Sequence, residues 1–181
     1  MKKNDKTIAI IVTYNRIELL KECILALVNS EKKCDILVVN NNSDDGTDEY
    51  LNLLPNIYKD INFYIYNLDE NLNGAGGFNY GIKKAVSLDY EYVWLMDDDT
   101  IVDKYALTEL YNIKIELNDE FGFLSSKVLW KDNSICKTNI QRLKVARRIS
   151  DFKSKLVKVD FTSFVSCFVK ISDILNIVEK V

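Results

Sequence analysis

Strand-like and helix-like segments alternate along the first half of the chain, and this alternation restricts the fold more than any other feature. Short apolar runs have the length of buried strands, and segments with apolar side chains every three or four positions follow them as amphipathic helices. The expected strands are Thr7–Val12, Ile36–Val39, Asn62–Tyr66 and Tyr92–Met96, and the expected helices run over Glu18–Asn29, up to Pro55, and from near Gly74 to about Leu88. Strands separated by helices pair in parallel through right-handed crossovers. The sequence therefore predicts an α/β fold with a mostly parallel sheet flanked by helices.

The rest of the chain has weaker patterns. Tyr105–Leu117 has the apolar spacing of a helix, and Phe121–Trp130 resembles a strand with a turn. Val159–Val169 reads as a last long strand, after which Ser172 is expected to cap a short final helix.

Composition favours one domain over residues 1–181. Hydrophobic residues make up 48% of the chain, enough for one sizeable core, and linkers or repeats do not interrupt them. No apolar run has the length of a membrane span, and the first residues lead into a strand rather than a signal-peptide core. We therefore expect a cytoplasmic protein.

The lack of histidine narrows the possible chemistry. The sequence contains no histidine, which excludes catalytic triads and metal sites that need imidazole. The cysteines lie far apart without a C-x-x-C pair, which argues against a zinc knuckle and a disulfide framework. Carboxylates must therefore carry any acid, base or metal-binding role.

Three consecutive carboxylates, Asp97, Asp98 and Asp99, end the apolar strand Tyr92–Met96. Adjacent negative charges repel one another, so a bound cation explains such a cluster better than folding does. Hard oxygen ligands favour Mg²⁺ or Mn²⁺. The alternative is a solvated acidic turn in which Asp99 caps a helix that starts near Asp103.

Two further loops suit a ligand. The segment Gly74–Gly77 follows a strand and opens a helix, so its amides can receive an anion, although it matches no complete phosphate-loop motif and a turn with positive φ explains it equally well. The asparagines Asn40–Asn42 follow another strand, where an Asx turn is the simpler interpretation.

In a parallel sheet these loops meet at the carboxyl ends of the strands, where α/β proteins bind ligands. Their combination predicts a polar crevice of nucleotide size beside a metal. A diphosphate ester is the natural ligand, because a metal there neutralises charge on a departing diphosphate.

Four motifs follow one another along the chain: Ile11–Arg16, Val38–Thr47, Asn71–Phe78 and Met96–Asp99. In this order they closely resemble glycosyltransferase family 2, and the resemblance covers essentially the whole chain. The glycines followed by Phe78, together with the Asp triplet, are most similar to its galactofuranosyltransferase and rhamnosyltransferase branch.

The resemblance implies a GT-A fold, a nucleotide-sugar donor, Mn²⁺ or Mg²⁺, and an inverting single displacement at the anomeric carbon. It implies that Asp97 and Asp99 bind the metal and that Asp98 contacts the donor sugar. The residues implied to line the donor are Thr13, Tyr14, Asn15 and Arg16 at the nucleotide, Asn41 and Asn42 near base or ribose, and Asn71, Gly76 and Gly77 at the diphosphate and sugar. Asn40 departs from the pattern, because relatives often have aspartate there, so a charge-assisted contact is lost.

The catalytic base is the other departure. Relatives that resemble Phe164–Val181 continue into an acidic pair that serves as base, and this chain ends before it, so the base is unassigned; Asp160 and Asp173 would replace it only by chance of geometry. A missing base typically lowers a rate about 10²- to 10⁴-fold. We therefore expect a C-terminally truncated domain for cell-surface polysaccharide synthesis that binds UDP-galactofuranose or dTDP-rhamnose, with weak or absent transfer to a saccharide or lipid-linked saccharide acceptor.

The charge of −3 is unevenly distributed. Residues 137–158 contain eight Lys/Arg and one acid, about +7, so the rest carries about −10, which disfavours nucleic-acid binding. The basic segment supports an alternative function, a non-catalytic donor-binding or interaction module that docks to a partner or to the membrane periphery.

A nucleotidyltransferase is a third, less favoured class. We also expect that an uncovered apolar face favours a homodimer.

Overall fold

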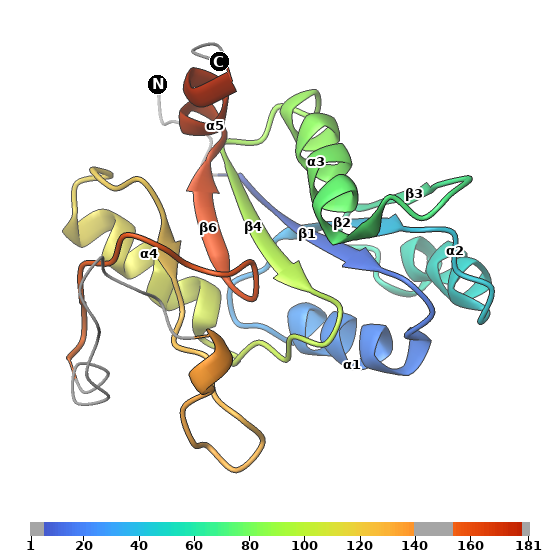
Figure 1. The fold of residues 1–181 in the computed structure, drawn as a ribbon, viewed down its shortest axis with the longest axis horizontal. Helices are drawn as coiled ribbons and strands as arrows, with labels where there is room; N and C mark the ends of the chain where they lie inside the picture. The colour runs from blue at the N-terminus through green and yellow to red at the C-terminus, as the bar shows by residue number, and fades with distance from the viewer. Residues whose placement is uncertain (1–5, 140–153, 179–181) are drawn as a thin grey trace.

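The computed structural model describes residues 6–139 and 154–178, which form an α/β sandwich (Figure 1). Strands and helices alternate through the first half, as predicted, and the second half has shorter strands. The elements are β1 (Thr7–Thr13), α1 (Ile17–Val28), β2 (Asp35–Asn40), α2 (Thr47–Ile57), β3 (Phe63–Asn67), α3 (Asn73–Val86), β4 (Tyr92–Asp97), α4 (Ala106–Glu116), β5 (Leu124–Ser125), the 3₁₀ helix η1 (Lys137–Asn139), β6 (Cys167–Lys170) and α5 (Ile171–Val178).

The strands form one mixed sheet in the order β3-β2-β1-β4-β6-β5. Strands β1 to β4 pair in parallel, whereas β6 is antiparallel to both β4 and β5. The prediction of a mostly parallel sheet flanked by helices is confirmed.

Helices cover both faces of the sheet because the strands alternate their side chains between two apolar cores. Ala9 and Ile11 of β1 face a core shared with α1, α2 and α4, whereas Ile8 and Ile10 face a core shared with α3 and α5. All four side chains are fully buried. The unbroken apolar character of β1 therefore follows from its central, doubly covered position.

Two predictions for the second half are wrong in extent. The long strand expected over Val159–Val169 begins only at Cys167, because the residues before Cys167 do not pair with β4. There, the Phe164 ring packs at 4.9 Å from that of Phe78. The strand expected over Phe121–Trp130 is confined to Leu124–Ser125.

The expected helix boundaries also shift at two places. Ser172 does not cap α5, since that helix starts at Ile171, directly after β6. Helix α2 continues two residues past Pro55 and ends at Ile57. Among the described residues, we find no helix that combines the length and the apolar character needed to cross a bilayer.

Close packing of α3 on the sheet predicts a specific sensitivity to mutation. A Cβ at Gly81 would lie 2.7 Å from Ile10 Cγ2, whereas a Cβ at Gly74, in the first turn, would meet nothing within 4 Å. We expect Gly81→Ala to lower the free energy of unfolding by about 1–3 kcal/mol, because the helix must move off the sheet. Gly74→Ala should leave it unchanged or raise it by up to about 1 kcal/mol.

Urea denaturation of both variants measures this difference. Equal stabilities of the two variants would contradict the packing that the structure shows.

Candidate functional site

The carboxyl ends of β1, β2 and β4 lie side by side and end in polar residues. The register aligns Thr13 with Asn40 and Val12 with Asp97, so Asp98 comes next to Thr13. This is the edge where the sequence predicts the crevice, and it follows from the parallel pairing.

Asp98 is buried at this edge and holds β4 against the end of β1. It is only 3% exposed. Thr13 Oγ1 donates a hydrogen bond to Asp98 Oδ2 at 2.8 Å, and Arg16 Nη1 donates to Oδ1 at 3.0 Å. Burial raises the pKa of Asp98, although the Thr13 hydrogen bond and the Arg16 charge act in the opposite direction. Asp98 therefore has a structural role, because it binds Thr13 and Arg16 within the chain, and the resemblance alone did not indicate this role.

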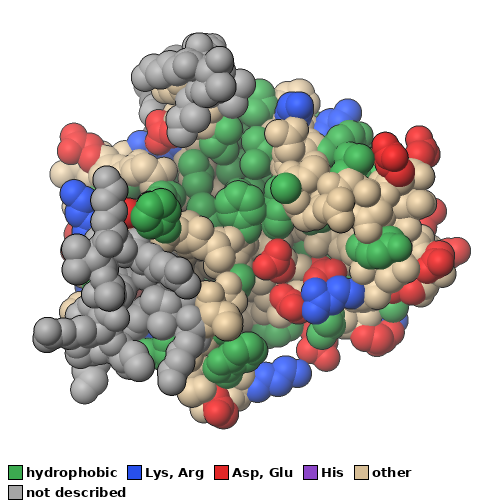
Figure 2. Space-filling model, in the orientation of Figure 1, with side chains coloured by type: hydrophobic (Ala, Val, Ile, Leu, Met, Phe, Trp, Pro, Cys, Tyr) green, Lys and Arg blue, Asp and Glu red, His purple; other side chains and the backbone are tan. Residues whose placement is uncertain are grey.

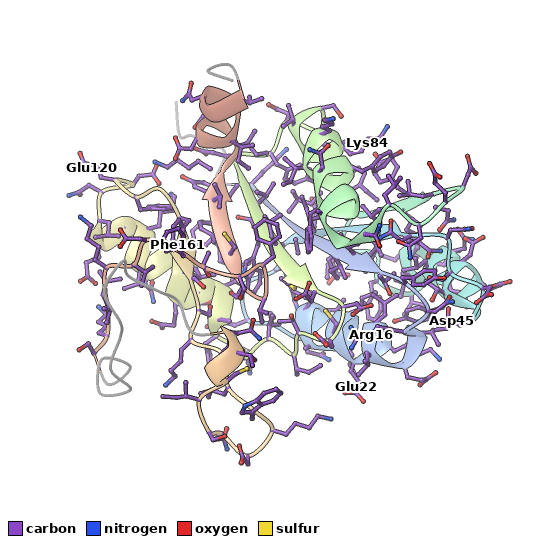
Figure 3. All side chains as sticks on the ribbon, in the orientation of Figure 1. Arg16, Glu22, Asp45, Lys84, Glu120 and Phe161 are labelled. Carbon is purple, nitrogen blue, oxygen red and sulfur yellow. The ribbon has the colours of Figure 1, made fainter. Side chains whose placement is uncertain are left out.

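Arg16 is the internal counter-ion of the triplet. Its second nitrogen, Nη2, lies 2.9 Å from Asp99 Oδ2, and the side chains of both residues are about half exposed. Figure 2 shows a basic side chain among acidic ones at this edge, and Figure 3 labels Arg16 there, near the start of α1. Because Asp99 pairs with Arg16, and because α4 starts only at Ala106 after Tyr105, the alternative that Asp99 caps a helix near Asp103 is wrong.

Asp97 is the carboxylate of the triplet for which the described residues supply no hydrogen-bond donor. Among the residues that the structure describes, its side chain accepts no hydrogen bond, and only Arg16 opposes its charge. Burial raises the pKa of Asp97, and the negative charges of Asp99 and Asp98 raise it further. Holding this side chain ionised therefore costs free energy that a bound cation would offset.

The donor set fits a hard divalent cation that a ligand helps to hold. Within the described ranges, no group of three or more Cys, Asp or Glu side chains forms a ready-made metal cage. Mg²⁺ is commonly bound through one or two carboxylates together with the phosphates of a substrate. Asp97, which has no donor in the described part of the chain, and Asp99, which is accessible from solvent, suit that arrangement.

The loops after β1 and β2 are joined through Asn15. Its backbone N–H donates to Ser43 Oγ at 3.0 Å, and its side-chain oxygen accepts from the Asp44 N–H at 2.8 Å. Asn15 has a φ of 52°, which asparagine tolerates better than most residues. Asn15 thus shapes the loop that carries the exposed Tyr14.

The three asparagines after β2 have different roles. Asn40 is engaged internally, since its amide donates to Asn67 Oδ1 and its oxygen accepts from the Ser43 N–H, one residue farther along the chain than in an Asx turn. Asn41 is 2% exposed and donates to the Asn73 carbonyl, but its own side-chain oxygen has no partner among the described residues. Asn42 is exposed with a φ of 64°. An unpaired buried acceptor is costly, so Asn41 suits a ligand hydroxyl or N–H.

The glycine-rich segment forms the first turns of α3, and the positive φ expected there lies at Asn73, not at a glycine. Asn71 accepts the Asn73 N–H with its side-chain oxygen. A Cβ at Gly77 would lie 2.5 Å from Val12 Cγ1 and 3.0 Å from Asn41 Nδ2. A Cβ at Gly76 would lie 2.6 Å from Leu72 Cβ. Glycine at position 77 therefore lets the start of α3 lie directly on the ends of β1 and β2, whereas glycine at position 76 makes room for Leu72.

Sequence reasoning missed the segment that approaches this edge from the C-terminal part. Thr100 Oγ1 lies 3.4 Å from the Val165 carbonyl, and the Phe78–Phe164 contact joins the same segment to α3. Ser163 Oγ is buried without a partner in the described part of the chain. No motif marks this segment, because its position depends on the turn that leads into β6.

Asp173 lies at the other end of the sheet from the triplet. Lys170, the last residue of β6, pairs with Tyr92, the first residue of β4, and α5 follows at once. The antiparallel direction of β6 therefore excludes Asp173 as a base at this site. Residues 140–153 of the predicted basic segment lie outside the described residues.

The same strand-end loops fall inside one family model. Residues 8–122 match the model of glycosyl transferase family 2, a span from β1 to the end of the α4 region. The chain belongs to glycosyl transferase family 2.

Curated family 2 relatives match about half of the chain. A galactofuranosyltransferase, GlfT1 of Mycolicibacterium smegmatis, is 33% identical over 100 residues, which are 55% of this chain and 32% of that protein. A poly-beta-1,6-N-acetyl-D-glucosamine synthase of Staphylococcus aureus is 37% identical over 100 residues, 54% of this chain and 22% of that protein. The match thus spans a third or less of the length of these relatives.

Solved structures show the same fold at lower identity. TarS 1–349 of S. aureus superposes with a TM-score of 0.68 at 17% identity, over 96% of this chain and 49% of that chain. The mannosyltransferase PcManGT of Pyrobaculum calidifontis, in complex with GDP-Man and Mn²⁺, has a TM-score of 0.57 at 21% identity, over 71% of this chain and 37% of that one. These likenesses support the GT-A fold that the family 2 motifs predict.

The raised pKa of Asp97 predicts a pH-dependent gain of stability on neutralising it. Above the raised pKa, the folded state pays for an ionised Asp97; well below the ordinary value of 3.8, the carboxyl is protonated in both states and the penalty vanishes. We expect Asp97→Asn to raise the free energy of unfolding at about pH 7, by an amount that shrinks as the pH falls toward about 3.

Urea denaturation across this pH range, without metal, measures the effect. The matched control is Asp60→Asn, which removes one exposed carboxylate between α2 and β3. The same pH-dependent gain in both variants would contradict a penalty specific to the triplet.

Proposed function

We propose that the chain binds a nucleotide-sugar donor with a divalent cation, as the donor-binding part of an inverting, metal-dependent family 2 glycosyltransferase. The observation that carries this proposal is the arrangement at the carboxyl end of β4. Asp97 has no hydrogen-bond donor among the described residues, Asp99 is about half exposed, and Arg16 is positioned between Asp98 and Asp99. The unpaired oxygen of Asn41 and the start of α3 lie along the same strand ends.

In this proposal Asp97 and Asp99 hold Mn²⁺ or Mg²⁺, which supplies charge neutralisation for a departing diphosphate. Arg16 exchanges Asp99 for the donor while remaining anchored on Asp98. Its half-exposed side chain allows this exchange, and buried Asp98 supplies the anchor. Asp98 then acts on the donor mainly through Arg16 and Thr13, rather than by direct contact with the sugar.

The nucleotide lies against the segment from Thr13 to Arg16, with Asn41 and Asn42 near base or ribose. The diphosphate and sugar lie at Asn71, Gly76 and Gly77, where the amides of the first turns of α3 favour an anion. Support for the ligand class comes from two neighbours of the same fold, TarS 1–349 in complex with UDP-GlcNAc and PcManGT in complex with GDP-Man and Mn²⁺.

For the donor we propose UDP-galactofuranose or dTDP-rhamnose, with a saccharide or lipid-linked saccharide as acceptor in cell-surface polysaccharide synthesis. The name of one relative, a galactofuranosyltransferase, supports the first donor, whereas another relative is a poly-N-acetylglucosamine synthase. Cytoplasmic location, contact with the membrane periphery and a homodimer stay predictions. The alternative, an interaction module based on residues 137–158, depends mainly on residues outside the described ranges and also stays a prediction.

Metal-dependent UDP binding tests the central assignment. We expect UDP with Mn²⁺ to bind the chain, and the double variant Asp97→Asn with Asp99→Asn to bind at least about 100-fold more weakly, since both proposed metal ligands are lost. Isothermal titration calorimetry with and without EDTA measures both effects.

The control double variant is Asp60→Asn with Asp89→Asn, which removes the same charge away from the triplet and keeps a residue type that tolerates the φ of 57° at Asp89. If the triplet variant binds UDP and Mn²⁺ as tightly as the parent does, the metal assignment is wrong.

Transfer by this chain should be slow or undetectable. No described carboxylate is assigned as the base that deprotonates the acceptor hydroxyl, and lack of a base typically lowers a rate about 10²- to 10⁴-fold. Release of nucleoside diphosphate from UDP-galactofuranose and dTDP-rhamnose, with and without oligosaccharide acceptors, measures transfer. Acceptor-dependent turnover at ordinary enzymatic rates would show that a base is present.

A further inference from the structure

One carboxylate, that of Asp45, joins the first residues of two helices. Asp45 Oδ2 accepts a hydrogen bond from the backbone N–H of Ile17 at 2.9 Å, across 28 positions of sequence. Asp45 Oδ1 accepts from Thr47 Oγ1 at 2.6 Å and from the Thr47 N–H at 3.3 Å. Ile17 begins α1 and Thr47 begins α2. Figure 3 labels Asp45 in this region, on the same side of the molecule as Arg16.

Neither helix receives a side-chain cap from its own N-cap residue, Arg16 for α1 and Gly46 for α2. The first N–H groups of a helix lack intrahelical partners and carry partial positive charge, so an anionic acceptor stabilises them. Partial burial alone would raise the pKa of Asp45, but the hydrogen bonds from Thr47 and Ile17 outweigh it and lower that pKa. Asp45 is therefore ionised at neutral pH and serves as the shared cap.

The two loops that Asp45 joins are also connected at Asn15, through Ser43 Oγ and the Asp44 N–H. Together these contacts fasten the segment Tyr14–Arg16 to the β2–α2 loop on both sides. Arg16 lies between the two attachments, Asn15 and Ile17, and its guanidinium reaches Asp98 and Asp99 from there. The backbone on both sides of Arg16 is thus held by the β2–α2 loop, and this determines where the Arg16 side chain starts.

We infer that Asp45 is a positioning residue of the donor site: it holds the first turn of α1 against α2, so that the Tyr14–Arg16 segment keeps the conformation that receives the nucleotide and directs Arg16 to the aspartates. The inference rests on the donor binding proposed above. Asp45 acts at a distance, through the Ile17 amide, without touching the donor.

Three variants separate this role from a purely local one. Asp45→Ala removes both attachments. Asp45→Ser leaves a hydroxyl that can still accept from the Thr47 N–H two residues on, as serine does in turns, but it is too short to hold Ile17 as well. Asp44→Ala is the matched control, because Asp44 is an exposed neighbouring carboxylate whose described contact is through its backbone N–H.

Two measurements are made on each variant of the full chain. Amide hydrogen exchange over residues 14–19, without ligand, reports whether the start of α1 is held. Calorimetric titration with UDP and Mn²⁺ reports the donor site. We expect faster exchange and about tenfold weaker UDP binding in Asp45→Ala and in Asp45→Ser, and wild-type values in Asp44→Ala. Melting temperatures confirm that the variants are folded, and Asp45→Ser keeps the local turn if Asp45→Ala does not fold.

The outcomes distinguish this inference from the proposed function. Wild-type UDP affinity in Asp45→Ser, whether or not exchange over residues 14–19 is faster, overturns the positioning role and leaves donor binding intact. Equally weakened UDP binding in Asp44→Ala would show that the effect comes from the loss of a negative charge, and it would also overturn the positioning role. If the wild-type chain binds no UDP with Mn²⁺ while exchange still responds to Asp45, the proposed function fails and the helix attachment alone remains.

Discussion

The candidate site depends on keeping three adjacent carboxylates together at the end of a buried strand. Thr13, the last residue of β1, and Arg16, the N-cap residue of α1, make this possible through hydrogen bonds to Asp98, and Arg16 also pairs with Asp99. These contacts compensate only part of the negative charge, and burial still raises the pKa of Asp97 and of Asp98. The chain thus maintains a site that is unfavourable by itself and that the proposed cation would stabilise, a common conflict between stability and function.

The sheet places the strand ends that form the site, and contacts between the loops fix the conformation of the residues that follow them. Parallel pairing of β1 with β2 and β4 places the strand ends in one row, and Gly77 lets α3 lie directly over them. The loops are then fastened to one another by short polar side chains, notably those of Asn15 and Asp45. A rigid frame with interlocked loops reduces the conformational entropy lost when a ligand binds. This explains why asparagine and aspartate are so frequent in these loops without all of them having to touch a ligand.

Much of the first half of the fold could be predicted from local pattern, and the second half could not. The strands β1, β2 and β4 are apolar runs with clear polar ends, so their positions were predicted to within about a residue, in line with what such patterns allow. Residues 159–166 combine aromatic and β-branched residues typical of a strand with polar ones, yet only Cys167–Lys170 enters the sheet as β6. A strand pattern does not reveal whether a partner edge is available, and here the preceding residues turn toward Phe78 instead. The alternation that indicates a parallel sheet also gave no sign that β6 would run antiparallel.

By itself, the sequence determined the α/β class, the four polar segments at strand ends, and an acidic cluster without histidine, because periodicity and residue chemistry are local properties. The tertiary structure decided how the polar residues divide their roles. It pairs Asp98 and Asp99 with Arg16 and engages Asn40 internally. It leaves Asp97 and the side-chain oxygen of Asn41 without donors among the described residues, and it places Asp173 at the opposite end of the sheet. These differences arise from contacts between residues tens of positions apart, and only the strand register and helix packing bring such residues within hydrogen-bonding distance.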